Sequence, residues 1–329
     1  MTLPSSIMAP TRPLRIVFMG TPAFAVPTLQ AILDGEDLVV GVYTQPDQPS
    51  GRGMTRHAPP IKKLAEARGI PVFQPVKLRT PEALEPLRAW QPDLIVVVAY
   101  GKMLPNSVLT LPPLGCINVH ASLLPKYRGA APIQWAIANG EKETGVTIMR
   151  IIERMDAGDI LLQKSLPITE EDTGGSLHDK LSTLGAAALA EALSLLKQDR
   201  LIARTQNEAD VTYAPIIKKE DGRIDWSWNA VAIERRIRAF NPWPSAYTTF
   251  EGKLLKIFKA HPEKVVTHSP ITSGTVSGTV IEASPVHLLV ATGEGQLSLL
   301  EVQLEGKRRM PIEEFLRGHA IKPGMNLGS

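Results

Sequence analysis

The stretch DLIVVVAYG, residues 93–101, predicts the fold class most strongly. Its apolar run is continuous rather than alternating, which is typical of a strand that is buried on both faces of a parallel sheet. Two similar runs precede it, LRIVFM at 14–19 and DLVVGVYT at 37–44. Stretches with helical character lie among these strands, at 61–68 and 81–90. Because strands and helices alternate, we predict an α/β domain with a parallel sheet that helices cover on both faces.

Small and polar residues follow the ends of these strands. Gly20 ends the first strand, and Tyr100 and Gly101 end the third. Ligands bind at the carboxyl ends of parallel strands, near the point where the strand order switches, so we expect the site at this edge. The letters GTPA at 20–23 do not form the G-x-G-x-x-G fingerprint of dinucleotide-binding folds, which counts against a nicotinamide-dependent dehydrogenase.

The last third of the chain has a different pattern. A predicted helix at 228–240 is followed by five short β-type segments, at 246–250, 254–259, 278–281, 286–291 and 296–304. Turns rich in glycine, serine and proline separate these segments. This pattern favours a small, OB-like β-barrel.

These patterns divide the chain into four parts. An amphipathic helix at 175–198 is expected to close the α/β domain, and the chain then turns polar and irregular. We therefore predict an N-terminal tail at 1–13, the α/β domain at 14–203, a linker at 204–222 and the OB-like domain at 223–329.

The composition limits the class of protein. The 329 residues are 43% hydrophobic and 21% charged, with a net charge of +3, which is ordinary for a globular protein and permits contact with a polyanion. The single cysteine, Cys116, excludes a disulfide framework and is expected to be a small buried hydrophobe. Residues 1–13 do not resemble a secretion signal, and no apolar run is long enough to span a bilayer, so we expect a cytoplasmic protein without membrane contact. No H-x-x-x-H or C-x-x-C spacing is present, and no metal is expected.

Three polar residues stand out as candidates for chemistry. The stretch GCINVHASLLPKYRGAAP at 115–132 places Asn118 and His120 two positions apart on a predicted strand, so both side chains point to one face. Asp156 falls on a tight connection between two β-type runs within 145–163. Taken singly, an aspartate before glycine is most often a turn residue, and a lone asparagine or histidine is most often structural. The three together, beside glycines that let a substrate approach, predict a catalytic site.

With these residues in place, the chain resembles the folate-dependent formyltransferases. The matching pieces are FMGTPAFA (18–25), TQPDQPSGRG (44–53), VVVAYGKMLP (96–105), INVHASLLPKYRGAAPIQWAI (117–137), ETGVTIMRIIERMDAGDIL (143–161) and RAFNPWP (238–244). The sequence N-x-H, followed by SLLP and R-G-x-x-P, is specific to this superfamily. The Pro/Gly/Arg-rich loop at 44–60 and the sequence FNPWP narrow the resemblance to the members that act on tRNA.

The resemblance implies a Rossmann-like formyltransferase domain in which Asn118, His120 and Asp156 are catalytic. The implied reaction moves the formyl group from N10 of 10-formyltetrahydrofolate to the α-amine of methionyl initiator tRNA, for translation initiation. An asparagine amide can stabilise the charge that develops on the formyl oxygen. A histidine can donate a hydrogen bond or transfer a proton, and the aspartate can hold its charge and help to take the proton from the attacking ammonium.

The resemblance also implies contacts with the folate co-substrate. It places Ser122, Leu123, Leu124 and Pro125 along the folate. The strand end at 96–105 would offer backbone groups to the pterin ring, at Tyr100 and Leu104. For the loop that follows His120, the alternative is a rigid surface turn in which Lys126 and Arg128 stay solvated.

Contacts with tRNA are predicted at two places. The resemblance implies that the 44–60 loop reaches the acceptor stem through Arg52 and Arg56, since a planar, permanently charged guanidinium suits phosphates and base edges. The OB-like domain is expected to bind tRNA with Lys307 and Arg308. A flexible, solvated loop and an ordinary lysine-rich surface are the alternatives.

Two rival functions remain open at this point. A formyltransferase for an amino sugar or small amine would not need the 44–60 loop or the basic second domain. A non-catalytic tRNA- or folate-binding module would not need the three polar residues together. We expect a monomer.

Overall fold

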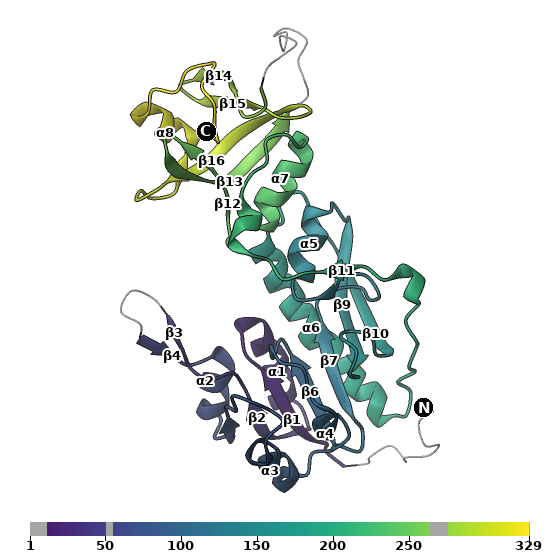
Figure 1. Ribbon diagram of the computed structural model, residues 1–329. Helices are drawn as coiled ribbons and strands as arrows, with labels where there is room; N and C mark the ends of the chain where they lie inside the picture. Colours follow the sequence, from purple (N-terminus) through teal and green to yellow (C-terminus); the bar gives the residue numbers. More distant parts are fainter. Residues whose placement is uncertain (1–11, 51–54, 264–275, 329) are drawn as a thin grey trace. The chain divides into compact units, whose positions relative to one another are not determined.

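The computed structural model describes residues 12–50, 55–263 and 276–328. The chain forms two compact units (Figure 1). Unit 1 comprises the chain up to Pro132, Glu143–Pro167 and His178–Ala214, and unit 2 comprises Ile133–Lys142, Ile168–Leu177 and Pro215–Ser329. Each unit therefore combines segments that are distant in the sequence. Among the described residues, no helix is both long and apolar enough to cross a membrane.

Unit 1 is built on a seven-stranded sheet with the order β10-β9-β7-β6-β1-β2-β5. Its strands are β1 (Arg15–Gly20), β2 (Leu38–Tyr43), β5 (Val72–Phe73), β6 (Leu94–Val98), β7 (Cys116–His120), β9 (Glu143–Arg150) and β10 (Ile160–Pro167). The five strands from β7 to β5 pair in parallel, which confirms the predicted α/β class. β9 is antiparallel to both β7 and β10, and the short connection between β9 and β10 contains no crossover helix.

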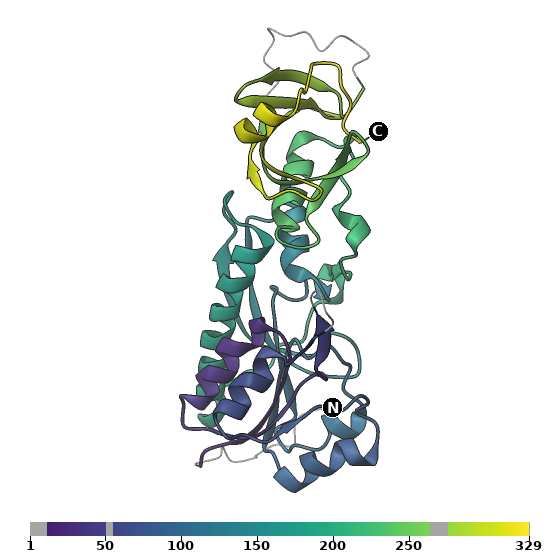
Figure 2. The ribbon, with the colours of Figure 1, turned by 90° about the vertical axis from the view of Figure 1, so that its left-hand side faces the viewer.

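Helices cover both faces of this sheet (Figure 2). Gly185 of α6 lies against Val119 of β7, on one face. Leu87 of α3 belongs to the same apolar cluster as Cys116 of β7, and residues 116 and 119 of a strand point to opposite faces. The helices of the chain before residue 200 are α1 (Val26–Leu33), α2 (Pro60–Ala67), α3 (Pro81–Trp90), α4 (Asn106–Leu109), α5 (Pro132–Ala138) and α6 (Gly174–Lys197).

Local sequence signals account for the ends of α3. Pro81 stands at its first position, where a missing N–H costs nothing, and the side chain of Thr80 accepts a hydrogen bond from Ala83 N. The helix ends at Gln91, which adopts a left-handed conformation with φ 45°. The predicted bounds of this helix, 81–90, are confirmed.

The only cysteine of the chain, Cys116, begins β7. Its side chain is 3% exposed and packs in the apolar cluster that contains Leu87. Burial raises the pKa of its thiol to about 12. The expectation of a small buried side chain is confirmed.

The 44–60 segment, predicted as a long loop, contains a small hairpin. β3 (Gln48–Ser50) and β4 (Thr55–His57) pair in antiparallel fashion. The pairing joins Gln48 to His57 and Ser50 to Thr55.

Contacts from outside the hairpin fix its base at Asp47. Lys62 Nζ lies 2.9 Å from Asp47 Oδ2, and Gln74 Nε2 donates to Asp47 Oδ1 at 2.7 Å. These hydrogen bonds, first from Gln74 and then from Lys62, lower the pKa of the Asp47 carboxyl. Gln74 Nε2 also donates to the carbonyl of Gln45 at 2.8 Å.

Unit 2 contains an antiparallel sheet with the order β12-β13-β16-β15-β14, in which β17 also pairs with β16. The strands of this sheet are β12 (Ala246–Phe250), β13 (Lys253–Glu263), β14 (Val280–Ser284), β15 (His287–Ala291), β16 (Gln296–Leu304) and β17 (Met310–Pro311). The helices of the chain after residue 215 are α7 (Ala230–Ala239) and α8 (Ile312–Gly318). Ile233 and Ile237 of α7 are buried in one core with Leu255 and Leu297 of the sheet. The five predicted segments all correspond to strands, and the prediction of a smaller C-terminal β domain is confirmed.

Candidate active site

β7 carries two of the three predicted catalytic residues at its carboxyl end. The strand lies between β6, to which it is parallel, and β9, to which it is antiparallel. Asn118 is half-buried, and the His120 side chain is 6% exposed. The two side chains lie on the face of Cys116, opposite Val119. The strand on which the prediction placed both residues is confirmed.

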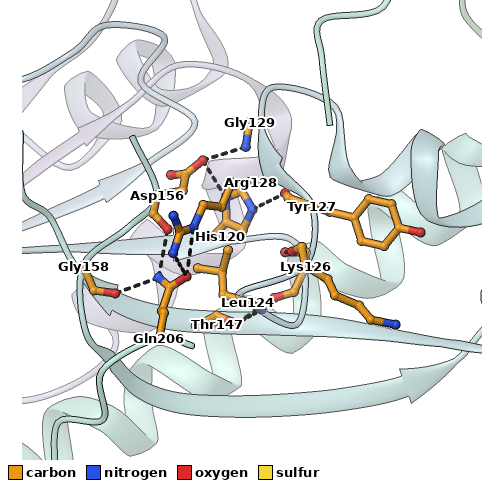
Figure 3. A network of polar contacts seen from close by, with 11 residues as sticks. His120, Leu124, Lys126, Tyr127, Arg128, Gly129, Thr147, Asp156, Gly158 and Gln206 are labelled. Atoms are coloured by element: carbon orange, nitrogen blue, oxygen red, sulfur yellow. Dashed lines mark hydrogen bonds and ion pairs between the residues drawn. The ribbon is translucent and has the colours of Figure 1, made fainter. Parts of the chain in front are cut away.

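The hydrogen bonds of His120 assign its two ring nitrogens. Nε2 lies 3.0 Å from the carbonyl oxygen of Tyr127 (Figure 3). Because a carbonyl can only accept, Nε2 carries the proton in the neutral imidazole as well as in the imidazolium. Nδ1 lies 3.7 Å from Asp156 Oδ2. The nitrogen that can gain or lose a proton therefore faces the carboxylate.

Asp156 reaches the site from the connection between β9 and β10. Its backbone has a φ of 47°, in the left-handed region, and its Oδ2 accepts a hydrogen bond from Gly129 N at 2.8 Å. The two explanations of this residue, a turn and a catalytic side chain, are thus compatible. The turn directs the carboxylate toward His120.

The loop after β7 is held both by side chains of β9 and β10 and by hydrogen bonds of its own. Thr147 Oγ1 donates to the carbonyl of Ser122 at 2.6 Å and accepts from Leu124 N at 3.1 Å. Gln163 Nε2 donates to the carbonyl of Leu124 at 2.9 Å. Within the loop, Ser122 Oγ donates to the carbonyl of Lys126 at 2.6 Å. Residues 122–126 are therefore held in one conformation beside the catalytic residues.

The predicted folate residues of this loop differ in exposure. Ser122 is fully buried, and Leu124 packs in an apolar cluster with Met149 and Ile160. Leu123 and Pro125 are half-buried and present part of their surface to solvent. Contact with a folate is thus open to the latter pair and to backbone groups.

Tyr100 and Leu104 belong to the core of unit 1. Both side chains are buried in the cluster beneath α3 and α4, and burial raises the pKa of Tyr100 to about 12. The carbonyl of Tyr100 accepts from Thr21 Oγ1 at 3.2 Å and from Gln45 Nε2 at 2.9 Å. Contact of Tyr100 and Leu104 with the pterin ring remains a prediction. Because both side chains are buried, their backbone groups would make this contact.

Sequence reasoning missed two polar residues of the site. Arg128 does not stay solvated, as one alternative held, because its side chain is only 1% exposed. Gln206 lies in the segment predicted as a linker, yet it is 5% exposed and hydrogen-bonds to Arg128 and to the connection that carries Asp156. The R-G-x-x-P motif pointed to Arg128, whereas no pattern in the sequence distinguished Gln206 from its polar neighbours.

The predicted tRNA residues are spread over the chain. Arg52 lies outside the described residues, and Arg56 is exposed on β4. Lys307 and Arg308 are exposed in the turn after β16, in unit 2. Arg308 forms an ion pair with Glu314, so part of its charge is already neutralised.

The chemistry of this site rests on an amide, an imidazole and a carboxylate. Among the residues that the structure describes, no three His, Cys, Asp or Glu side chains converge on a possible metal position. The set can stabilise a developing oxyanion and move a proton, which are the two needs of acyl transfer to an amine.

Two family models match most of the chain. Residues 14–193 match the formyl transferase model, and residues 216–320 match the model of the formyl transferase C-terminal domain. The chain is 49% identical over 316 residues to the methionyl-tRNA formyltransferase of Citrifermentans bemidjiense, which covers 96% of both chains. It is 51% identical over 316 residues to that of Methylococcus capsulatus, covering 96% of this chain and 100% of the relative.

Solved structures share the fold at lower identity. An N-formyltransferase from Helicobacter canadensis, in complex with folinic acid and dTDP-3-aminofucose, aligns with a TM-score of 0.63 at 19% identity, over 87% of this chain and 98% of that one. HypX from Aquifex aeolicus, in complex with tetrahydrofolic acid, aligns with a TM-score of 0.58 at 19% identity, over 95% of this chain and 50% of that one.

Proposed function

We propose a function from the premise that the chain belongs to the formyl transferase family, among the methionyl-tRNA formyltransferases. The resemblance inferred from the sequence is thereby confirmed. The protein is a transferase that moves the formyl group of 10-formyltetrahydrofolate to the α-amino group of methionyl initiator tRNA. The product, N-formylmethionyl-tRNA, serves translation initiation.

Asn118 is the proposed donor to the formyl oxygen. When the amine attacks the formyl carbon, a C–N bond forms and negative charge develops on that oxygen. A neutral amide N–H can stabilise this charge without being consumed. Asn118 is half-buried on β7, two positions before His120.

His120 is the proposed carrier of the proton through Nδ1. The attacking group arrives as an ammonium and loses one proton to solvent before its nitrogen can attack. After the C–N bond forms, this nitrogen loses a second proton, while N10 of the folate must gain one when its bond to the formyl carbon breaks. The neutral imidazole can take the second proton and give it to N10, so that the imidazole returns to its starting state. Asp156, 3.7 Å away, would balance the charge of the imidazolium during the transfer.

The remaining assignments follow the family. Ser122, Leu123, Leu124 and Pro125 are proposed to line the folate, with the backbone near Tyr100 and Leu104. Arg52, Arg56, Lys307 and Arg308 are proposed to bind tRNA. The protein is proposed to act as a monomer in the cytoplasm, with its catalytic domain at 14–203, a linker at 204–222 and a tRNA-binding domain at 223–329.

The observation that supports these roles best is the pairing of His120 Nδ1 with Asp156 Oδ2 beside Asn118. The test is formyl incorporation into Met-tRNA with 10-formyltetrahydrofolate, for the wild type, His120→Ala and Asp156→Asn. Loss of an essential acid–base group should lower kcat on the order of 100- to 10,000-fold. A His120→Ala variant that folds and retains near-normal transfer would refute the assignment. A dTDP-amino sugar offered as acceptor to the wild type should not be formylated.

A further inference from the structure

Residues 127–129 contact both proposed catalytic side chains through their backbone. The carbonyl of Tyr127 accepts the hydrogen bond from His120, and the N–H of Gly129 donates to Asp156 (Figure 3). The residue between them, Arg128, pairs with Tyr213 where the short strands β8 (Arg128–Gly129) and β11 (Tyr213–Ala214) run in parallel. Its side chain turns inward and is 1% exposed.

The guanidinium of Arg128 is fixed by residues 206–208. Nε and Nη2 donate to Gln206 Oε1 at 3.0 and 2.8 Å, and Nη2 also donates to Glu208 Oε1 at 2.9 Å. Nη1 has no hydrogen-bond partner among the described residues. All side-chain hydrogen bonds of Arg128 in the described part of the chain are therefore directed at this one segment.

Gln206 also contacts the β9–β10 connection that carries Asp156. Its Nε2 donates to the carbonyl of Asp156 at 2.8 Å and to the carbonyl of Gly158 at 2.7 Å. Because its oxygen faces two donors and its nitrogen faces two acceptors, the amide has one orientation that satisfies all four contacts. These two carbonyls lie on either side of Ala157, the residue that follows Asp156.

The connection around Asp156 has little freedom of its own. Asp156 adopts a left-handed backbone conformation that residues with side chains rarely visit. A Cβ on Gly158 would lie 1.9 Å from the carbonyl oxygen of Arg150, so this glycine admits no larger residue without a shift of the backbone. The direction of the Asp156 side chain therefore depends on the contacts that hold these carbonyls and on the hydrogen bond from Gly129 N to its Oδ2.

We propose that Gln206, oriented by Arg128, is a positioning residue that sets the Asp156 carboxylate against Nδ1 of His120. The inference rests on the proposed function, since it concerns how the catalytic pair is held. Arg128 and Gln206 close a ring that joins the loop contacting His120 to the connection carrying Asp156, in addition to the direct hydrogen bond from Gly129 N to Asp156 Oδ2. Substrate binding does not require this ring, whereas the geometry of proton transfer does.

The experiment compares Gln206→Glu with the wild type in the formyl-transfer assay. Glutamate keeps an oxygen for Arg128 but replaces the two N–H donors by an oxygen that repels the carbonyls of Asp156 and Gly158. We expect kcat to fall roughly 10- to 100-fold, as for a displacement of about 1 Å at a reacting group, with KM for both substrates within about twofold. The pH profile of kcat should also shift, because the charges around the His120 imidazole move. Gln198→Glu, the same change at an exposed glutamine at the end of α6, should leave kcat, KM and the pH profile unchanged.

A second variant, Arg128→Lys, guards against a folding defect. Lysine keeps a buried positive charge but cannot donate the paired bonds of the guanidinium. The same fall in kcat and shift of the pH profile are expected, at an unchanged midpoint of thermal unfolding. Unchanged kcat in both variants, or losses that follow the unfolding midpoint with the pH profile intact, would overturn the inference. If neither variant folds, these residues hold the fold rather than the catalytic pair, and the inference is rejected as well.

His120→Ala, measured in parallel, separates this inference from the proposed function. Loss of transfer in His120→Ala with normal transfer in Gln206→Glu rejects the positioning role alone. Normal transfer in His120→Ala rejects the catalytic assignment itself.

Discussion

At His120, the carbonyl of Tyr127 occupies Nε2, and Nδ1 is left to exchange a proton with a substrate. The neighbouring Asn118 does not gain or lose a proton, since its amide can only donate from nitrogen and accept at oxygen. The difference explains why the two side chains cannot replace each other. Asn118 would stabilise the charge on the formyl oxygen, and His120 would transfer the proton.

Asn118→Asp tests the residue that stabilises charge without exchanging protons. The change is nearly isosteric but replaces a donor by an anion beside the developing oxyanion, so kcat should fall on the order of 100- to 1,000-fold. The measurement is kcat for formyl transfer, together with the midpoint of thermal unfolding. Asn106→Asp, at an exposed asparagine that begins α4, is the matched control and should retain wild-type kcat. A small effect at Asn118 would assign the oxyanion to another donor.

Local sequence was sufficient to place Asn118 and His120 on one strand and Asp156 on a connection between two strands, because strand patterns and a turn signature mark these elements. It was not sufficient for Gln206. Gln206 contacts the carbonyls of Asp156 and Gly158, which lie 50 and 48 residues earlier in the sequence. A local sequence pattern does not reveal contacts over such a separation. The inward direction of Arg128 was hidden for the same reason, since its partners lie 78 and 80 residues later.

At the scale of elements, β9 supports the loop that follows β7 through one hydroxyl. Thr147 is fully buried, and its Oγ1 contacts both the carbonyl of Ser122 and the N–H of Leu124. Within residues 121–126 the backbone forms a hydrogen bond from Lys126 N to the carbonyl of Leu123, and Pro125 has no N–H to donate. A side chain from the neighbouring strand supplies further bonds.

Thr147→Val removes this support while keeping the shape of the side chain. Two buried backbone groups lose a partner, so the free energy of unfolding should fall by about 1–3 kcal/mol. KM for 10-formyltetrahydrofolate should rise more than KM for tRNA, because residues 122–125 are the proposed folate contacts. Chemical denaturation and steady-state kinetics measure the two effects. Thr144→Val, also buried in β9, is the control, and equal effects of the two substitutions would contradict the role of the loop.

The β3–β4 hairpin was not predicted from the sequence, although all strands of the two sheets except the two-residue β5 and β17 were. Its strands contain only three residues each, without the apolar alternation that marks a half-buried strand. Its base depends on Asp47, whose partners Lys62 and Gln74 lie in later parts of the chain. Pairing of this kind is a property of the fold.

Asp47→Asn should loosen this hairpin without unfolding unit 1. The ordinary pKa of an aspartate, about 4, is lowered here, so the contribution of the carboxylate is present at neutral pH and is lost as the pH falls below that range. We expect faster amide hydrogen exchange in β3 and β4 of the variant at pH 7, and a smaller difference from the wild type at acidic pH. Asp34→Asn, at an exposed aspartate that ends α1, is the control. Unchanged exchange in Asp47→Asn would show that the hairpin does not depend on this anchor.

For the whole molecule, the net charge of +3 is too small to describe binding to a polyanion. The arrangement of charges matters more. In the run that follows β16, Arg308 pairs with Glu314 and Arg309 pairs with Glu301, whereas no acidic side chain among the described residues forms an ion pair with Lys307. Lys307 is therefore the most available of the three for a phosphate.

Lys307→Ala should change the salt dependence of tRNA binding more than Arg308→Ala. Each phosphate contact releases counterions, so the logarithm of affinity falls linearly with the logarithm of salt concentration, and loss of one contact lowers the slope by about one unit or slightly less. The measurement is the equilibrium affinity for Met-tRNA between about 50 and about 200 mM salt. Equal changes of slope in the two variants would show that pairing with Glu314 does not restrain Arg308. A slope near zero in the wild type would exclude an electrostatic contribution to binding.

The burial of Cys116 has a practical consequence for the study of motion. Its thiol is shielded from solvent and its pKa is raised to about 12, so at neutral pH it should not react with maleimides. Since the chain has no other cysteine, a thiol introduced at an exposed position becomes a unique attachment point in the otherwise native sequence. Fluorophores attached through Glu66→Cys on α2 and Glu305→Cys beyond β16 would label one unit each. Energy transfer between them would then report, molecule by molecule, how the separation of the two units responds when tRNA is captured and released.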